Sequence, residues 1–229
     1  MKNYNQQYNY AHPDSFSMRI ANRARRAMFA RFMANFTPNF DHTVLDVGVT
    51  ADQSYASSNY FEALYPFKSK ITACGLDDAH FLEIQYPGVT FQFADALNLP
   101  FDDQSYDFVH SSAVWEHVGD DKKQRRMLTE CLRVARCGVM LTTPNRWFPI
   151  EFHCQLPLVH WLPKPIFRSI LQRTPYRDLA SEVVLNLLTP AEIKQMTKFY
   201  SGWDFKIEYY RLMYWPSNIL LIGIKSSYT

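Results

Sequence analysis

Apolar and polar positions along the chain follow two alternating periods, one typical of buried strands and the other typical of helices. Short apolar runs predict strands over residues 43–49, 70–76, 90–94, 106–111 and 138–143. Helical spacing between them predicts helices near residues 54–65, 79–85 and 120–135. Strands that alternate with helices pair in parallel through crossover connections, so this pattern predicts an α/β domain built on a parallel sheet.

The first forty residues differ from this repeating unit. Residues 1–14 are polar, and apolar residues at helical spacing predict a helix over 15–36 that Pro38 ends. We therefore expect residues 1–40 to form a tail and a capping helix, followed by a single domain over residues 41–229.

The pattern changes again after the fifth predicted strand. Residues 145–189 are rich in proline and aromatic side chains, and Thr189-Pro190 predicts the start of a further helix. Two more strands, 203–212 and 217–225, are close enough in the sequence to pair antiparallel. Because residues 145–189 follow the carboxyl end of a strand, where α/β sheets bind ligands, we expect an insertion that acts as a lid. The alternative is an insertion that only covers the core.

The composition limits the classes of partner. The chain of 229 residues carries a net charge of +2, which provides no broad attraction to nucleic acid. No apolar run is long enough to cross a bilayer, and the first residues lack the apolar core of a secretory signal. The four cysteines have neither the spacing of a zinc site nor that of a disulfide framework. We therefore expect a cytoplasmic protein with no nucleic-acid partner and no metal site.

Three of the predicted strands end in an acidic residue. The first runs through Asp46 into Gly48, and the second and third end at Asp77 and Asp95. Carboxyl ends of parallel strands meet at one edge of a sheet, where such acids and a small-residue loop form a nucleoside pocket. The loop after Gly48 is unusual, because Val-Thr-Ala-Asp stands where nucleotide-binding loops carry more glycines.

The charge of this loop helps to decide which nucleoside fits. A dinucleotide would place its pyrophosphate beside Asp52, and like charges repel. A P-loop is excluded, because no Gly-Lys-Ser/Thr sequence follows the strand. S-adenosylmethionine has no phosphate, and its sulfonium and amino groups are compatible with nearby acids. A nicotinamide-dependent oxidoreductase stays open as an alternative.

At these positions the chain resembles the class I S-adenosylmethionine-dependent methyltransferases, in particular small-molecule enzymes with a domain of the methyltransferase type 11 kind. The resemblance covers residues 41–145 and, more loosely, the last strand pair. It rests on motifs that occur in the family's order: Asp46-Val47-Gly48, Gly75-Leu76-Asp77, Asp95-Ala96 with Leu99-Pro100-Phe101, Ser105 to Val109 with Glu116-His117-Val118, and Leu132-Arg133-Val134 with Thr143-Pro144-Asn145. It implies a Rossmann-like seven-stranded, mostly parallel sheet with helices on both faces and an antiparallel C-terminal strand pair.

The same resemblance implies a site for S-adenosylmethionine as the cofactor. Asp77 would receive the ribose hydroxyls, and Asp95 would lie near the adenine. The cofactor-binding candidates are Asp46, Gly48, Thr50, Asp52, Asp77, Asp95, Ala96 and Ser111. Thr50 and Asp52 depart from the family pattern, which often has glycine there. Two interpretations of Asp52 stay open: it meets the amino group of the cofactor, or it caps the next helix.

Methyl transfer to a hydroxyl group benefits from a general base, and three residues are candidates for that task. His117 follows the fourth strand, and His153 with Glu151 follows the fifth. Each histidine has a structural alternative, as a packed side chain with no part in the reaction. By family habit, we expect transfer to an oxygen of a small molecule or of a glycan or lipid precursor. A member that only binds a cofactor or a partner is the alternative.

Residues 152–173 add an expectation about partners. Leucines and aromatic residues alternate there with prolines and with Lys164, Arg168 and Arg173. Such a segment fits a lid over a small-molecule acceptor, or a patch that touches a membrane surface. The expected location is therefore cytoplasmic, with peripheral membrane contact as an option. The sequence predicts no oligomeric state.

Overall fold

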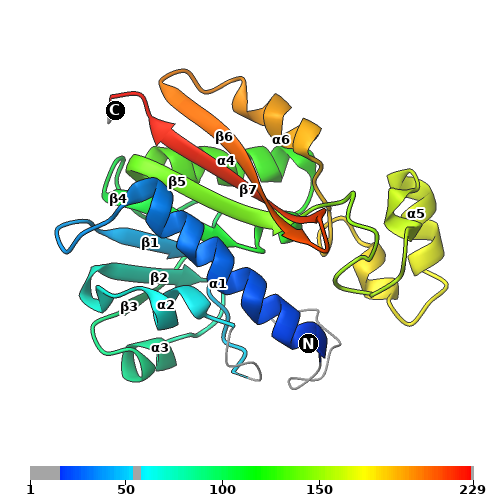
Figure 1. Ribbon diagram of the computed structural model, residues 1–229, viewed down its shortest axis with the longest axis horizontal. Coiled ribbons are helices and arrows are strands. Elements are labelled where there is room, and N and C mark those ends of the chain that lie inside the picture. The colour runs from blue at the N-terminus through cyan, green and yellow to red at the C-terminus, as the bar shows by residue number, and fades with distance from the viewer. Residues whose placement is uncertain (1–15, 54–57, 228–229) are drawn as a thin grey trace.

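The computed structural model describes residues 16–53 and 58–227 of the chain. Their strands form one seven-stranded sheet in the order β3-β2-β1-β4-β5-β7-β6 (Figure 1). The strands are β1 (Val44–Val47), β2 (Ile71–Gly75), β3 (Thr90–Phe93), β4 (Tyr106–Ser112), β5 (Ala135–Pro144), β6 (Trp203–Leu212) and β7 (Trp215–Lys225). Strands β1 to β5 pair in parallel, and β7 pairs antiparallel with both β5 and β6. The predicted sheet and its antiparallel C-terminal pair are confirmed.

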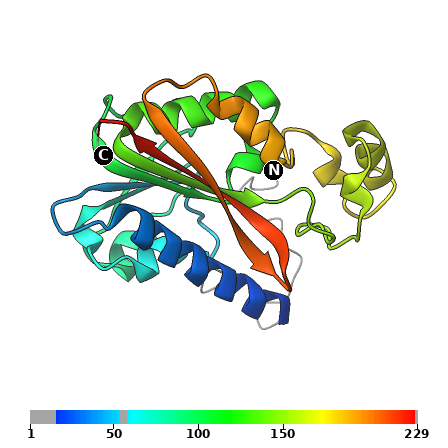
Figure 2. The ribbon, with the colours of Figure 1, turned by 45° about the horizontal axis from the view of Figure 1, so that its top comes forward.

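Helices cover both faces of this sheet (Figure 2). The α-helices are α1 (Phe16–Phe36), α2 (Tyr60–Leu64), α3 (Phe81–Gln85), α4 (Asp121–Val134), α5 (Lys164–Leu171) and α6 (Pro190–Thr197). Short 3-10 turns are η1 (Lys68–Lys70), η2 (Trp115–His117), η3 (Val159–Trp161) and η4 (Arg177–Ala180). Helix α1 lies across one face together with α2 and α3, and α4 and α6 lie on the other face.

The N-terminal helix is held on the sheet by aromatic side chains. The ring of Phe32 is fully buried and meets the rings of Phe61 and Phe108 edge to face, with centroids 5.0 and 6.2 Å away. A Cβ atom on Gly138 of β5 would lie 2.4 Å from the ring of Phe36. Glycine at this position therefore lets α1 approach β5 closely, as a helix that caps the sheet requires.

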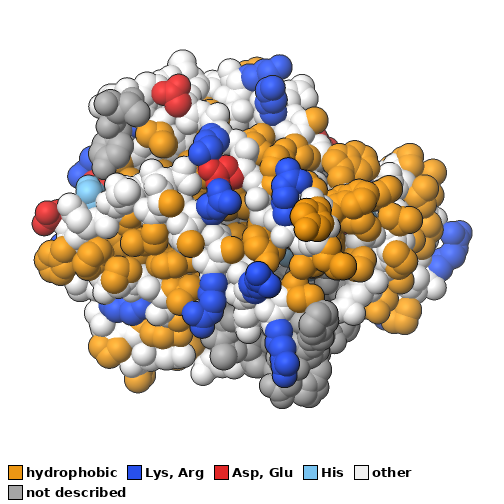
Figure 3. Space-filling view, viewed as in Figure 1, with side chains coloured by type: hydrophobic (Ala, Val, Ile, Leu, Met, Phe, Trp, Pro, Cys, Tyr) orange, Lys and Arg blue, Asp and Glu red, His pale blue; other side chains and the backbone are white. Residues whose placement is uncertain are grey.

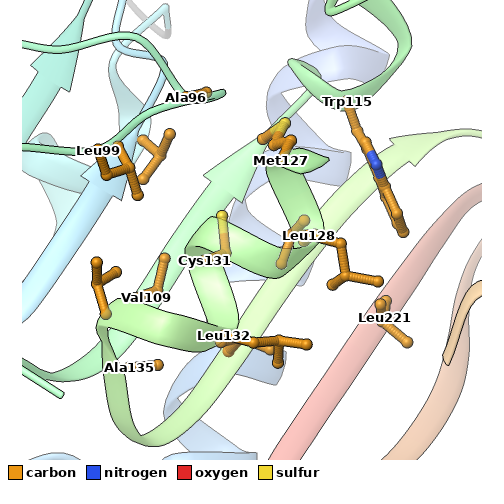
Figure 4. Packing of buried hydrophobic residues seen from close by; sticks show 14 of the residues in the cluster. Ala96, Leu99, Val109, Trp115, Met127, Leu128, Cys131, Leu132, Ala135 and Leu221 are labelled. Carbon is orange, nitrogen blue, oxygen red and sulfur yellow. The ribbon is translucent and has the colours of Figure 1, made fainter. Parts of the chain in front are cut away.

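Helix α4 packs its apolar stripe on the opposite face of β4 and β5 (Figure 4). The side chains of Leu128 and Cys131 are fully buried there, next to Trp115 from η2. The helix begins where the Asp120 carboxylate accepts a hydrogen bond of 2.9 Å from the backbone N–H of Lys123. Its single apolar stripe explains why the sequence pattern identified this element almost to the residue.

The two largest differences from the predicted element boundaries concern α2 and β5. Helix α2 begins at Tyr60, with Asn59 as its N-cap residue, and is shorter than the helix predicted over 54–65. Residues 54–57 of that prediction lie outside the described residues. Strand β5 begins at Ala135, directly after α4, because Ala135 already has an extended backbone and pairs with Tyr106. The predicted start at residue 138 was therefore too late.

Residues 145–189 form a lobe beside the sheet, visible at the right of Figure 1 around α5. The lobe has an apolar cluster of its own, made of Cys154, Phe167, Leu171, Leu179, Ala180, Leu185 and Leu187. All four cysteines are free and buried. Among the helices of the described residues, none combines the length and apolarity that a bilayer crossing needs.

Candidate functional site

The carboxyl ends of four parallel strands meet at one edge of the sheet. Val47 of β1 lies opposite Cys74 of β2 and Ser111 of β4, and Gly75 of β2 lies opposite Phe93 of β3. The acids and loops that follow these strands are therefore neighbours, as the sequence pattern predicted.

The loop after β1 is closed by hydrogen bonds that compensate for its few glycines. Gly48 has a φ of 92°, which favours glycine, and the backbone N–H groups of Gly48 and Val49 both donate to the Cys74 carbonyl, at 2.7 and 3.1 Å. The Asn59 side chain accepts from the Thr50 N–H and donates to the Thr50 carbonyl, both at 3.0 Å. This clamp holds a loop of non-glycine residues in a fixed shape.

Asp52 lies in the same loop and does not cap α2. Its backbone N–H donates to the Thr50 hydroxyl at 3.1 Å, and the helix starts eight residues later at Tyr60, after Asn59. The helix-cap interpretation of Asp52 is therefore wrong for α2. Its interpretation as a ligand for an amino group stays a prediction.

The two acids that follow β2 and β3, Asp77 and Asp95, differ in burial and in hydrogen bonding. The carboxylate of Asp77 is half-buried and makes no hydrogen bond or ion pair with any described residue. Asp95 is exposed, and its Oδ1 accepts the Leu97 N–H at 2.9 Å, whereas Ala96 is buried. Leu76 and Phe93, next to these acids, are 65% and 52% exposed. An unpaired carboxylate between exposed apolar side chains suits a ligand with hydroxyls and a planar ring.

Asp46 and Ser111 face inward and are held by neighbouring protein groups. Asp46 Oδ1 lies 2.6 Å from His110 Nδ1, and the Ser111 hydroxyl donates to the Val47 carbonyl at 2.8 Å. Burial raises the pKa of Asp46 to about 7 and lowers that of His110 to about 3. Burial and the neighbouring Asp46 carboxylate raise the pKa of Glu62 well above its usual range. These groups form a buried polar network under the loop.

A small cavity lies between this network and the loop. Its volume is about 20 Å³, and Asp46, Gly48, Asn59, Tyr60 and His110 are among the residues that line it. That volume is enough for about one water molecule. The cavity therefore belongs to the support of the loop, and a larger ligand would bind outside it.

A second polar cluster contains the three predicted catalytic residues. The Nε2 atoms of His117 and His153 lie 3.2 Å apart, and His153 Nδ1 lies 2.6 Å from Glu151 Oε1. His117 Nδ1 lies 2.6 Å from the Val184 carbonyl of the 145–189 lobe. Val114, one turn before His117, packs on Gly48 so closely that a Cβ there would lie 2.2 Å from its methyl group. The cluster thus adjoins the β1 loop.

The pKa values of the two histidines in this cluster shift in opposite directions. Burial, and then the proximity of His153, lower the pKa of His117 to about 3. Burial alone would lower the pKa of His153, but the charge and hydrogen bond of Glu151 outweigh it and raise that pKa. Burial would raise the pKa of Glu151, yet its bonds to His153 and Cys154 hold it at about 2. Glu151 and His153 therefore form a buried ion pair that points at His117.

The sequence did not identify three residues that complete these clusters. Asn59 clamps the loop, Glu62 lies under it, and Glu116 lies beside the histidines with its Oε2 accepting from the Thr143 hydroxyl at 2.8 Å. Glu116 is fully buried although it is acidic. The adjacent Glu116-His117 pair after β4 was a usable signal, because both side chains can hold a proton or a cation.

Comparisons with known proteins agree with this architecture. Residues 53–142 match the family model described as a methyltransferase domain, and the match begins just after the β1 loop. No curated protein matches the chain in sequence.

Solved structures extend the likeness over nearly the whole chain. An S-adenosylmethionine-dependent methyltransferase of Methanosarcina mazei is 20% identical, with a TM-score of 0.57 over 85% of this chain and 96% of that one. A protein of Pyrococcus horikoshii is 15% identical, with a TM-score of 0.59 over 94% of each chain. The magnesium protoporphyrin IX methyltransferase of Synechocystis PCC 6803, solved with bound S-adenosylhomocysteine, is 14% identical, with a TM-score of 0.55 over 90% of this chain and 84% of that one.

The family model covers the chain from the end of the β1 loop to residue 142 in β5, and the structural neighbours share the fold across the sheet. Both agree with the motif order found in the sequence, and the cofactor of this class is S-adenosylmethionine. Residues 53–142 of this chain match the methyltransferase-domain model, and the chain shares the fold of S-adenosylmethionine-dependent methyltransferases of known structure.

Proposed function

We propose that this protein is an active methyltransferase that transfers the methyl group of S-adenosylmethionine to an oxygen of a small-molecule acceptor. The observation that carries this proposal is the position of the histidine cluster. Val114 packs on Gly48 of the β1 loop, and one turn later His117 faces His153. A group able to take up a proton thus lies next to the loop that would hold the cofactor.

The residues at the strand ends fit the cofactor. The Asp77 carboxylate makes no hydrogen bond or ion pair with any described residue and would accept hydrogen bonds from the two ribose hydroxyls. The exposed side chains of Leu76 and Phe93 would cover the adenine ring, beside Asp95. Gly48 sets the shape of the loop, because its φ of 92° favours glycine and Val114 packs where a side chain would lie.

The chain's own contribution to the reaction is to position the acceptor and to receive its proton. When bound, S-adenosylmethionine supplies an electrophilic methyl group and a neutral thioether leaving group. Transfer of that methyl group to a hydroxyl acceptor would release the thioether and leave one acceptor proton for the chain to receive. The acceptor proton passes to the cluster of Glu116, His117 and His153, which Glu151 anchors. In-line placement of the acceptor supplies most of the rate enhancement.

We further propose that the acceptor is presented at a membrane surface. Three tryptophans, Trp147, Trp161 and Trp215, form an aromatic patch at the junction of the lobe and the β6–β7 turn, with ring centroids 6.4 and 6.2 Å apart. Trp147 and Trp215 are 44% and 46% exposed, and Met213 and Tyr214 in the turn are 89% and 95% exposed. Hydrophobic side chains gather over this side of the molecule in Figure 3. Exposed tryptophans with nearby Arg146 suit an interface between lipid headgroups and acyl chains.

The experiment that tests the proposed function measures S-adenosylhomocysteine formation from the purified protein with a panel of hydroxylated acceptors, including lipid-linked ones. Product that depends on an acceptor and decreases in His153→Gln supports oxygen methylation. Cofactor binding without product for any acceptor class, in protein that binds those acceptors, would favour a non-catalytic member. Quenching of reduced nicotinamide fluorescence by binding would instead favour an oxidoreductase.

A further inference from the structure

We infer that Glu116, His117 and His153 form a binding site for a divalent transition-metal cation, with Zn²⁺ as the best match. The inference contradicts the sequence-based expectation of no metal site, which considered only the spacing of the cysteines. The potential ligand atoms of these residues all lie within 4.8 Å of one another. One ligand pair comes from η2, directly after β4, and the third comes from the lobe after β5.

The three ligand atoms converge on a common point. The two imidazole Nε2 atoms are 3.2 Å apart with the ring planes perpendicular at 87°, and Glu116 Oε1 lies 3.9 Å from His117 Nε2. Two nitrogens bound to one Zn²⁺ at ~2.1 Å would be separated by about this distance. Glu116 is fully buried, and its Oε1 has no hydrogen-bond partner among the described residues. A buried carboxylate oxygen in that state is stabilised either by a proton or by a positive partner such as a cation.

In each of the three residues, the polar side-chain atom that faces away from the site is hydrogen-bonded to the protein, as is usual for metal ligands. The Val184 carbonyl can only accept, so His117 carries its proton on Nδ1 and turns Nε2 toward the site. The Glu151 carboxylate does the same for His153, through the 2.6 Å contact at Nδ1. The Thr143 hydroxyl donates to the second carboxylate oxygen of Glu116 at 2.8 Å. Such outer contacts orient metal ligands and raise their basicity.

The charge and ligand types of the cluster select the class of ion. Two buried carboxylates, Glu116 and Glu151, face two imidazoles, so with neutral histidines the cluster would carry two negative charges that one divalent cation would neutralise. Mg²⁺ and Ca²⁺ prefer sites made of oxygen atoms alone. Two imidazoles and one carboxylate suit Zn²⁺ with one coordination position left open. The alternative occupant is a proton shared between the two histidines.

The consequence for the reaction rests on the proposed function. In the cation-bound state the histidines would act as ligands, and an acceptor oxygen at the open position would be acidified there. The site would then bind the acceptor and promote loss of its proton, in place of a free histidine base. Binding of the metal itself does not depend on this step.

The test is a calorimetric titration of the full-length, chelator-treated protein with Zn²⁺ alone. We expect one equivalent to bind, and Co²⁺ in its place to give visible d–d absorption. Glu116→Gln keeps the size of the side chain and removes an anionic ligand, so Zn²⁺ affinity should fall at least roughly 100-fold. Thr143→Val removes only the outer hydrogen bond and should weaken binding roughly 10-fold. His80→Ala, at an exposed histidine outside the site, should leave the affinity unchanged.

Circular dichroism of each variant verifies folding, and the wild-type titration requires no variant. Absence of one-to-one Zn²⁺ binding to wild type would overturn the inference, as would an equal loss of affinity in His80→Ala. S-adenosylhomocysteine binding is measured in parallel. Zn²⁺ binding without nucleoside binding would support the metal site and contradict the proposed function, whereas the reverse result would contradict only the metal site.

Discussion

His117 and His153 place their Nε2 atoms 3.2 Å apart, although 36 residues separate them in the sequence. The contact joins the turn after β4 to the lobe after β5, and Glu151 fixes its outer end. In a metal-free state one proton must lie between the two nitrogens, because their outer atoms already donate. The proposed function assigns the proton of the acceptor to this cluster.

A change at His153 should separate catalysis from cofactor binding. His153→Gln removes a member of the cluster without touching the strand ends, so turnover should fall about 100- to 10,000-fold. S-adenosylhomocysteine affinity should stay within about threefold of wild type, because Asp77 and the β1 loop are unchanged. Steady-state kinetics with any accepted hydroxyl compound, paired with calorimetry, checks this. A matched control is His42→Gln, a histidine near the start of β1 that should leave both values unchanged. Equal losses in turnover and nucleoside affinity would show that His153 only supports the fold.

Burial of Glu62 should make the stability of the protein depend on pH. The pKa of Glu62 in the folded protein is raised well above 4.5. Above about pH 4.5 Glu62 is therefore ionised in the unfolded chain but still protonated in the folded protein, so folding takes up a proton. The contribution of this group is therefore fully present below about pH 4.5 and is lost as the pH rises, by at most about 1.4 kcal/mol per pH unit. Glu62→Gln cannot ionise, so its unfolding free energy should exceed that of wild type at pH 8 and approach it at pH 5.

Urea denaturation at pH 5, 6.5 and 8 measures this difference. Glu182→Gln is the control, because Glu182 forms a half-exposed ion pair with Arg168 and should shift stability little at any of these pH values. A difference between wild type and Glu62→Gln that stays constant from pH 5 to pH 8 would mean that Glu62 is ionised in the folded protein.

The aromatic patch predicts binding to lipid vesicles. Trp147→Ser with Trp215→Ser removes two exposed indoles and should reduce co-sedimentation with vesicles of mixed anionic and neutral lipids about tenfold. Phe199→Ser is the control, since Phe199 is 72% exposed but lies after α6, outside the patch. Wild-type protein that stays in the supernatant at every lipid concentration would remove the membrane proposal and leave the methyltransferase proposal intact.

The fold was largely predictable, because the relevant signals are local. Strands β1 to β5 were located from short apolar runs, and α4 was located from its single apolar stripe. The boundaries were harder where two elements touch, as at Ala135, where the helix ends and the strand begins with no intervening loop. The start of α2 was missed because the side chain of Asn59, its N-cap residue, hydrogen-bonds to Thr50 and does not cap the helix.

The site was predictable only where residues follow the strand ends. Asp77 and Asp95 were found because parallel strands place their ends together. The contact between His117 and His153 depends on how the 145–189 lobe folds back, and no spacing in the sequence encodes that path. Glu116 was overlooked because an acid after a strand usually faces solvent, and only the packing of the turn shows that it is buried.

The central claim is that this chain binds S-adenosylmethionine at the carboxyl ends of β1 to β4, with Asp77 on the ribose. Calorimetry with S-adenosylmethionine, on wild type, Asp77→Ala and Asp78→Ala, tests it most directly. We predict one-to-one binding to wild type, a loss of at least about tenfold in Asp77→Ala, and little change in Asp78→Ala, whose carboxylate is exposed and paired with His80. No heat of binding to wild type at millimolar cofactor would contradict the account, and unchanged affinity in Asp77→Ala would show that the cofactor site lies elsewhere.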